Sequence, residues 1–367
     1  MNRVEININP LVLRWAREEA GYEISEIADR LDVGSDRYKI WEKEGKSIPL
    51  GKLRKLADTY KRQLAVFLLP EVPKKISKPQ DYRRLSQADR RLSRKPLEVI
   101  REVKYFRETA YELHGENYWA SRYEWLSDLR KDHPDIDSLT ADLRELLDIS
   151  LEDQISWKSD SAAYKNWRQA VEDKLGILVF QFSMPMEEVQ GFCFTDGYPY
   201  AIVTNSNHSY TGRIFTIFHE LAHILRNNSG ICLYEQATER QAEEWECNLF
   251  AGKFLAPANA IVKSELEDEI RAFSARLHIS REVYLRRLKE ERLISDTKFF
   301  KMLSQVKATY PADKKKKGFV KPEVKSRAER GETFFNMVLD AMSENRISYS
   351  RASSALNLNL NALLNEV

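Results

Sequence analysis

Apolar side chains recur every three or four residues between residues 10 and 70, which is the spacing of one face of an α-helix. Glycine and proline interrupt this pattern several times, so we expect several short helices there. The spacing predicts one helix over 25–31, a turn over 32–34 and a second helix over 35–42. Two short helices joined by a three-residue turn are typical of a helix-turn-helix unit.

Helical spacing returns over 97–171 and then gives way to a different pattern. The runs 176–182, 191–195 and 200–205 are short, rich in β-branched and aromatic residues, and separated by turn-forming residues. Such runs predict the strands of a small sheet.

The rest of the chain again has helical spacing. It predicts a helix over about 213–227, a second over 238–257, and further helices over 260–306. Residues 307–330 are polar and include four successive lysines, which predicts a flexible connector. The remaining residues, 331–367, predict two or three short helices.

Composition restricts the class of protein. Lys and Arg number 58 against 56 for Asp and Glu, which excludes a uniformly basic coat for nucleic acid but not a local basic patch. No apolar run approaches the 18 or so residues of a membrane span, and the first residues lack the apolar core of a secretory signal. Three cysteines are too few for a disulfide framework. We therefore expect a cytoplasmic protein with no membrane partner.

The run 219–223, His-Glu-Leu-Ala-His, is the strongest chemical signal. On a helix, His219 and His223 share a face, so both can bind one metal ion. Glu220 lies beside them and can act as general base toward a water that the metal activates. The alternatives are two core histidines on an ordinary helix, and a metal site without catalysis.

Zinc held by two histidines needs a third protein ligand and keeps one position open. The following helix offers Glu244, which shares a face with Asn248. We choose Glu244 as the ligand and Asn248 as the acceptor of a hydrogen bond from a ligating histidine. Glu239 and Glu243 are alternative ligands.

Two residues just before this helix, His208 and Tyr210, are candidate donors to the oxyanion of a tetrahedral intermediate. The alternative for each is a solvated loop side chain. We expect the strand over 200–205 to present an extended substrate.

Three residues early in the predicted second helix, Ser35, Arg37 and Lys39, can reach a DNA groove. Asp36 has the wrong sign to face phosphate. The nine basic residues between 74 and 95 can add phosphate contacts, although a solvated linker explains them equally. A helical bundle used for protein contact is the alternative to DNA binding.

The stretch from Asn205 through the 219–223 motif to Pro257 resembles the ImmA/IrrE family of zinc metallopeptidases. The second half of that pattern reads roughly E-x-E-A-N-x-F-A and ends in Leu-x-Pro, and this chain departs from it with Cys247 in place of alanine. Residues 10–60 are similar to an Xre/Cro-type helix-turn-helix domain, and 334–356 is similar to the C-terminal helices of longer family members. The residues that carry the N-terminal similarity are Asn9-Pro10, Ala28, Trp41-Glu42, Gly45 and Pro49.

The resemblance implies an α+β protein, mainly α, with a small zincin-like unit whose short sheet binds an extended substrate at an edge. The domains expected in order are a helix-turn-helix domain over 1–72, a basic linker over 73–96, a zinc metallopeptidase domain over 97–306, a Lys-rich linker over 307–330 and a small helical segment over 331–367.

The function implied is that of a site-specific endopeptidase that uses Zn²⁺, or alternatively Mn²⁺, to cut a helix-turn-helix repressor and relieve repression of stress-response or mobile-element genes. The alternative is a DNA-binding regulator or antitoxin, with double-stranded DNA as partner and a sensory or structural zinc domain. In a third reading, the N-terminal domain binds the repressor by mimicking its dimer partner.

Overall fold

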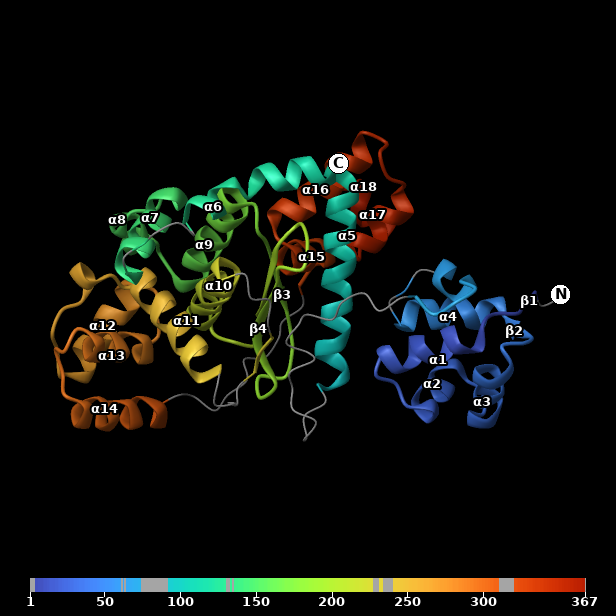
Figure 1. Cartoon of the computed structure of the whole chain (residues 1–367), viewed down its shortest axis with the longest axis horizontal. Coiled ribbons are helices and arrows are strands. Elements are labelled where there is room, and N and C mark those ends of the chain that lie inside the picture. Colours follow the sequence, from blue (N-terminus) through green and yellow to red (C-terminus); the bar gives the residue numbers. More distant parts are fainter. Residues whose placement is uncertain are drawn as a thin grey trace. The chain divides into compact units, whose positions relative to one another are not determined.

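The computed structural model describes residues 4–60, 62, 64–73, 92–129, 133, 135–226, 231–233, 240–309 and 320–366. The chain divides into two compact units, Met1–Tyr105 and Phe106–Val367. Helices dominate both units, and the second unit also contains a four-stranded sheet (Figure 1). The chain is therefore α+β and mainly α, as the sequence predicts.

The first unit consists of short helices joined by tight turns. α2 ends at Leu31 because Asp32 adopts a left-handed backbone with φ 53°, and α3 begins three residues later at Ser35. The predicted pair of helices and the turn between them are confirmed. The elements of this unit are β1 (Glu5–Ile6), α1 (Pro10–Glu19), α2 (Ile24–Leu31), α3 (Ser35–Glu44), β2 (Ile48–Pro49), α4 (Leu50–Tyr60), η1 (Leu64–Leu68) and the beginning of α5 (Arg94–Arg122).

A buried ion pair fixes α1 against α3. Arg17 Nε lies 2.7 Å from Glu42 Oε1, and the side chains are only 10% and 4% exposed. Apolar residues surround the pair, including Tyr38, whose hydroxyl is 2.7 Å from that of Tyr60. Because neither charge can be left alone at this depth, the pair holds the two helices in one relative position.

The second unit is built around the small sheet. Its strand order is β3-β5-β4-β6, with β3 parallel to β5 and the other neighbours antiparallel. The elements are α6 (Glu124–Leu129), α7 (Ile136–Leu147), α8 (Leu151–Ser156), α9 (Asp160–Leu175), β3 (Leu178–Phe182), β4 (Val189–Phe194), β5 (Ala201–Asn205), α10 (Tyr210–Leu225), β6 (Ile231–Leu233), α11 (Arg240–Leu255), η3 (Ala258–Ala260), α12 (Glu267–Arg276), α13 (Arg281–Glu290), α14 (Asp296–Ala308), α15 (Pro322–Arg330), α16 (Glu332–Ser343), α17 (Tyr349–Leu356) and α18 (Leu360–Leu364).

Helices cover both faces of this sheet. On one face, the hydroxyl of Tyr164 on α9 lies 3.0 Å from that of Thr204 on β5, and α10 packs alongside. On the other face, the ring of Phe180 on β3 lies 5.4 Å from that of Phe106 on α5 and 5.7 Å from that of Phe334 on α16. The C-terminal helices therefore supply part of the core of the sheet.

A second buried ion pair closes the outer edge of β3. Glu172 on α9 lies 3.3 Å from Arg168 Nε, accepts a hydrogen bond from the Val179 backbone N–H at 3.2 Å, and is 1% exposed. Arg168 donates to the Val179 carbonyl and, at 2.6 Å, to the Ala328 carbonyl at the end of α15. The pair thus satisfies the free backbone groups of an edge strand and anchors the C-terminal segment.

The three predicted strands are confirmed, and so are three short helices, α16 to α18, beyond residue 331. The structure differs from the prediction in three places, of which the first is the two-stranded sheet of β1 and β2. The short strand β6 was not expected, and the end of the expected 307–330 connector forms α15, which packs against β3. Most of the expected basic linker, residues 74–91, and the four lysines lie outside the described residues.

Among the described helices, none is long and apolar enough to cross a membrane.

We predict that Glu172→Gln lowers the free energy of unfolding of the second unit by about 3 kcal/mol, because it leaves Arg168 buried without its counter-charge. Urea unfolding of the full chain, followed by circular dichroism, measures the change. Glu344→Gln is the matched control, because Glu344 pairs with Arg346 at the surface, where such a pair contributes less than about 1 kcal/mol. Equal effects of the two substitutions would contradict the prediction.

Candidate metal centre

α10 carries the predicted metal motif along its buried side. Ser209 caps the helix by accepting a hydrogen bond from the Gly212 backbone N–H at 3.1 Å. The helix is apolar in its second half, so His219, Glu220 and His223 are all buried. Because four residues span about one turn, the two imidazoles lie on the same side of the helix.

α11 brings a carboxylate to these imidazoles. The two helices run side by side (Figure 1), and the ring of Phe218 stacks on that of Phe254 with centroids 4.1 Å apart. Glu244 Oε2 lies 3.1 Å from His219 Nε2, and Glu244 Oε1 lies 3.5 Å from His223 Nε2. The two imidazole nitrogens are 3.2 Å apart.

These three side chains fit a metal ion. Ligand atoms of all three lie within 4.8 Å of one another. Two ligand atoms at zinc-ligand distance from a tetrahedral ion are about 3.3–3.6 Å apart, close to the separations observed here. Two nitrogens and one oxygen are also the donor set of catalytic zinc sites, which keep a fourth position open.

The pKa values of the two imidazoles are shifted in opposite directions. Burial, followed by the charge of His219, lowers the pKa of His223 to about 4, so this imidazole is neutral at pH 7. Burial also acts to lower the pKa of His219, but the hydrogen bond that His219 donates to Glu244 and the charges of Glu220 and Glu244 outweigh it, so that pKa is raised. Before a cation binds, the proton of the site therefore lies on His219 beside Glu244.

The outer nitrogens of both imidazoles have partners on α11. His219 Nδ1 lies 3.1 Å from Asn248 Oδ1, so its N–H donates there, while the protonated Nε2 donates to Glu244 and would offer its lone pair to a cation once that proton has left. His223 Nδ1 lies 3.7 Å from Cys247 Sγ. Burial raises the pKa of the Cys247 thiol to about 12, so it remains protonated and is not a thiolate ligand at neutral pH.

Glu220 is fully buried where α10 approaches β4. The approach depends on Gly191 of β4, since an added Cβ would lie 2.3 Å from Thr216 Cγ2, 2.8 Å from the Val203 carbonyl oxygen and 3.4 Å from Glu220 Oε1. A glycine on β4 thus allows the strand to lie directly against the proposed general base.

The structure does not bring His208 and Tyr210 to the cluster. Tyr210 is the first residue of α10, and nine residues at about 1.5 Å each place it about 13 Å from His219 along the helix axis. Its ring lies 5.9 Å from that of Tyr164, and the His208 ring packs against Gly212. The structure therefore gives no support to an oxyanion role for these residues. Tyr210 lies about two and a half turns before His219, and His208 precedes the first residue of α10.

The expected substrate strand is also corrected. The 200–205 run forms β5, which is paired on both sides, with β3 and β4, and so has no open edge for a peptide. The sheet has two edge strands, β3 and β6. Arg168 and Glu172 occupy the outer backbone groups of Val179 on β3, so β6 is the remaining edge at which an extended peptide could pair.

The remaining candidates are not among the three residues whose ligand atoms come together in the part of the chain that the structure describes. Glu243 is exposed on α11, and Glu239 lies outside the described residues. Arg37 and Lys39 are exposed on α3, where Lys39 Nζ pairs with Asp36 at 3.2 Å, and Ser35 is half-buried at the helix start.

Sequence reasoning missed Gly191 and the contact of Cys247 with His223. Gly191 has no specific signal in the sequence, since a single glycine in a strand indicates a bulge, a bend or a close contact without indicating the partner. The contact of Cys247 with His223 has no local signal either, since Cys247 stands where the family pattern has alanine.

We predict that Zn²⁺ binding near neutral pH releases protons, because the ion displaces the proton of His219. Affinity should rise with pH up to the raised pKa of His219 and level off above it. Calorimetry in buffers of different ionisation enthalpy measures the released protons. Heats that are independent of the buffer would contradict the assignment of His219 as a protonated ligand.

We predict that Gly191→Ala lowers the free energy of unfolding by about 1–3 kcal/mol, because the added methyl group overpacks the contact of β4 with α10. Urea unfolding measures this effect. Gly51→Ala is the matched control, since an added Cβ on that helical glycine meets nothing within 4 Å. A Gly191→Ala protein as stable as the control would contradict the prediction, because it would show that the contact of β4 with α10 accommodates a methyl group.

Comparison with known proteins gives one match. The model of the IrrE N-terminal-like domain, Peptidase_M78, matches residues 172–289, which include the whole candidate metal centre. No curated protein and no solved structure matches the chain. The match indicates a metallopeptidase-type domain over these residues.

Proposed function

We propose that this chain is a zinc-dependent endopeptidase that cuts a helix-turn-helix transcriptional repressor at a specific site. The observation that carries the proposal is the triangle of His219, His223 and Glu244 with Glu220 buried next to it. Two neutral nitrogens and a carboxylate favour Zn²⁺, and Mn²⁺ is the alternative that metal availability decides.

Each residue of the centre has a role in this reaction. His219, His223 and Glu244 would hold the ion, which when bound polarises the scissile carbonyl and makes water acidic enough to react. Glu220 takes a proton from the attacking water, and the oxygen of that water bonds to the carbonyl carbon. The same carboxyl then gives that proton to the amide nitrogen as the C–N bond breaks, which leaves a new carboxyl group and a new amine.

The proposed substrate follows from the resemblance of the chain to peptidases that act on helix-turn-helix repressors. The N-terminal unit gives it some support, because two helices joined by a three-residue turn form a unit of the same kind as the proposed substrate. Cleavage would relieve repression of stress-response or mobile-element genes.

We predict that Glu220→Gln keeps Zn²⁺ bound but lowers cleavage about 10²–10⁴-fold, because the amide cannot accept the proton of water. Mass spectrometry of new protein N-termini, in cells with and without DNA damage, compares this variant with the wild type. Glu243→Gln, at an exposed position on α11, is the matched control. A fragment that Glu220→Gln produces as efficiently as the wild type would contradict this mechanism.

A second candidate function is DNA binding by the N-terminal unit, as a regulator or an antitoxin. The exposed Arg37 and Lys39 on α3 favour it, while the pairing of Lys39 with Asp36 weakens the positive charge of that surface. The two functions are compatible, since DNA binding can bring the peptidase to a repressor on its operator.

For this second function we predict that Arg37→Ala and Lys39→Ala each weaken operator binding and reduce its salt slope by about 1, because each removes one phosphate contact. Asp36→Asn should strengthen binding. Fluorescence anisotropy over a range of salt concentrations measures all three. Unchanged affinity in both alanine variants would count against DNA binding through α3.

A further inference from the structure

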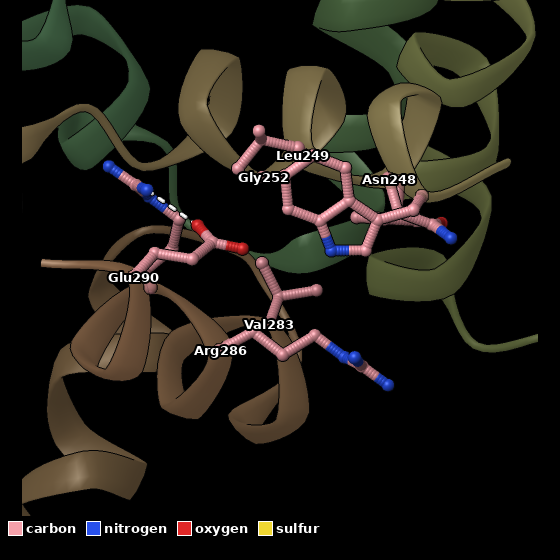
Figure 2. Close-up of a pocket in the computed structure, with 9 residues that line it drawn as sticks. Asn248, Leu249, Gly252, Val283, Arg286 and Glu290 are labelled. Carbon is pink, nitrogen blue, oxygen red and sulfur yellow. Dashed lines mark hydrogen bonds and ion pairs between the residues drawn. The ribbon is translucent and has the colours of Figure 1, made fainter. Parts of the chain in front are cut away.

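A hollow of about 50 Å³ lies beside the metal centre, between α11 and α13 (Figure 2). One face of α11 contributes Trp245, Leu249 and Gly252, α13 contributes Val283, and α10 contributes Phe215. A cavity needs about 10–15 Å³ of such space to hold one water, so the hollow has room for a few waters or for one large side chain.

The hollow shares residues with the metal centre. Asn248 lines it and accepts the hydrogen bond from His219 at 3.1 Å. Phe215 precedes His219 by about one turn of α10, and the two ring centroids are 6.2 Å apart. One residue of an extended peptide spans about 3.3–3.6 Å, so a residue adjacent to a bond cut at this centre can place its side chain here.

The buried charge in the wall of the hollow is already paired. Arg287 is fully buried and donates to Glu290 at 2.6 Å, to Glu291 at 2.5 Å and to the Ala256 carbonyl at 2.9 Å. Arg286 is exposed and extends away from Glu290, as Figure 2 shows. A charged occupant next to Arg287 and Glu290 would lose its water without gaining a free counter-charge, whereas an apolar occupant gains by leaving water.

The remaining surface suits an apolar occupant. Phe215, Leu249 and Val283 offer carbon surface, and Trp245 is 59% exposed although it is a large apolar side chain. Gly252 has no side chain, and an added Cβ would lie 3.4 Å from Arg287 Cδ, which is an ordinary contact. Space at Gly252 is therefore available without strain.

We propose that this hollow is a specificity pocket, and that it takes one large apolar side chain, such as Leu, Met or Phe, from the substrate residue next to the scissile bond. The inference rests on the proposed endopeptidase function. It adds Gly252 and Val283 as residues that set the size of the side chain accepted.

The test changes the size of the pocket in both directions. Gly252→Ala adds a methyl group to it and also raises helix propensity, so loss of folding is not expected. Val283→Ala removes two methyl groups from the opposite wall, and its fold is checked by thermal unfolding. Gly51→Ala is the control for a glycine-to-alanine change in a helix away from any neighbour.

Zn²⁺-loaded full-length proteins are incubated with a peptide library, and the new termini are sequenced. Gly252→Ala should lower the preference for Phe over Val next to the cut about tenfold, since a methylene in such a pocket changes specificity by about that factor. Val283→Ala should shift the preference toward Phe and Trp. If the wild type cuts and neither variant shifts its preference, the pocket assignment is wrong.

A second measurement does not depend on cleavage. N-acetyl-phenylalaninamide should shift the NMR signal of the Trp245 indole N–H, which Trp245→Phe identifies, while N-acetyl-alaninamide should not. Gly252→Ala should reduce the shift. If the library is not cut but the signal responds, the proposed function fails and the apolar pocket stands. No response to either probe would overturn the pocket.

Discussion

The packing of α10 between β4 and α11 is the constraint on which the site depends. It removes water from two imidazoles and a carboxylate, and ionisable groups at that depth must be compensated. α11 supplies compensation through Glu244, and a cation would complete it. The same packing requires a glycine at 191, because β4 leaves no space for a side chain beside Thr216.

The sheet beneath the site is completed by parts of the chain far from it in sequence. Phe106 precedes the sheet by some seventy residues, Phe334 follows it by about a hundred, and both rings pack on Phe180. The ion pair of Arg168 and Glu172 closes the edge of β3 and holds the end of α15. The C-terminal helices are therefore part of the domain that carries the metal centre, and substrate pairing at β3 is blocked.

The metal centre and the hollow beside it are coupled through Asn248. Its amide oxygen orients His219, while the residue also lines the hollow. A side chain bound in the hollow would contact the group that sets the direction of a metal ligand. In the proposed peptidase, such a side chain would therefore lie next to the residue that orients His219.

The sequence by itself determined the features that depend on local spacing. His219 and His223 share a face because they are four residues apart on one helix, and the same face argument selected Glu244 and Asn248 on the next helix. Only the tertiary structure decided what depends on contacts between distant residues: the need for Gly191, the interior position of β5, the helix where a connector was expected and the hollow between α11 and α13. Tyr210 lies about 13 Å before His219 along the axis of α10 although the two are near in sequence, and the packing of α11 against α13 carries no local sequence signal.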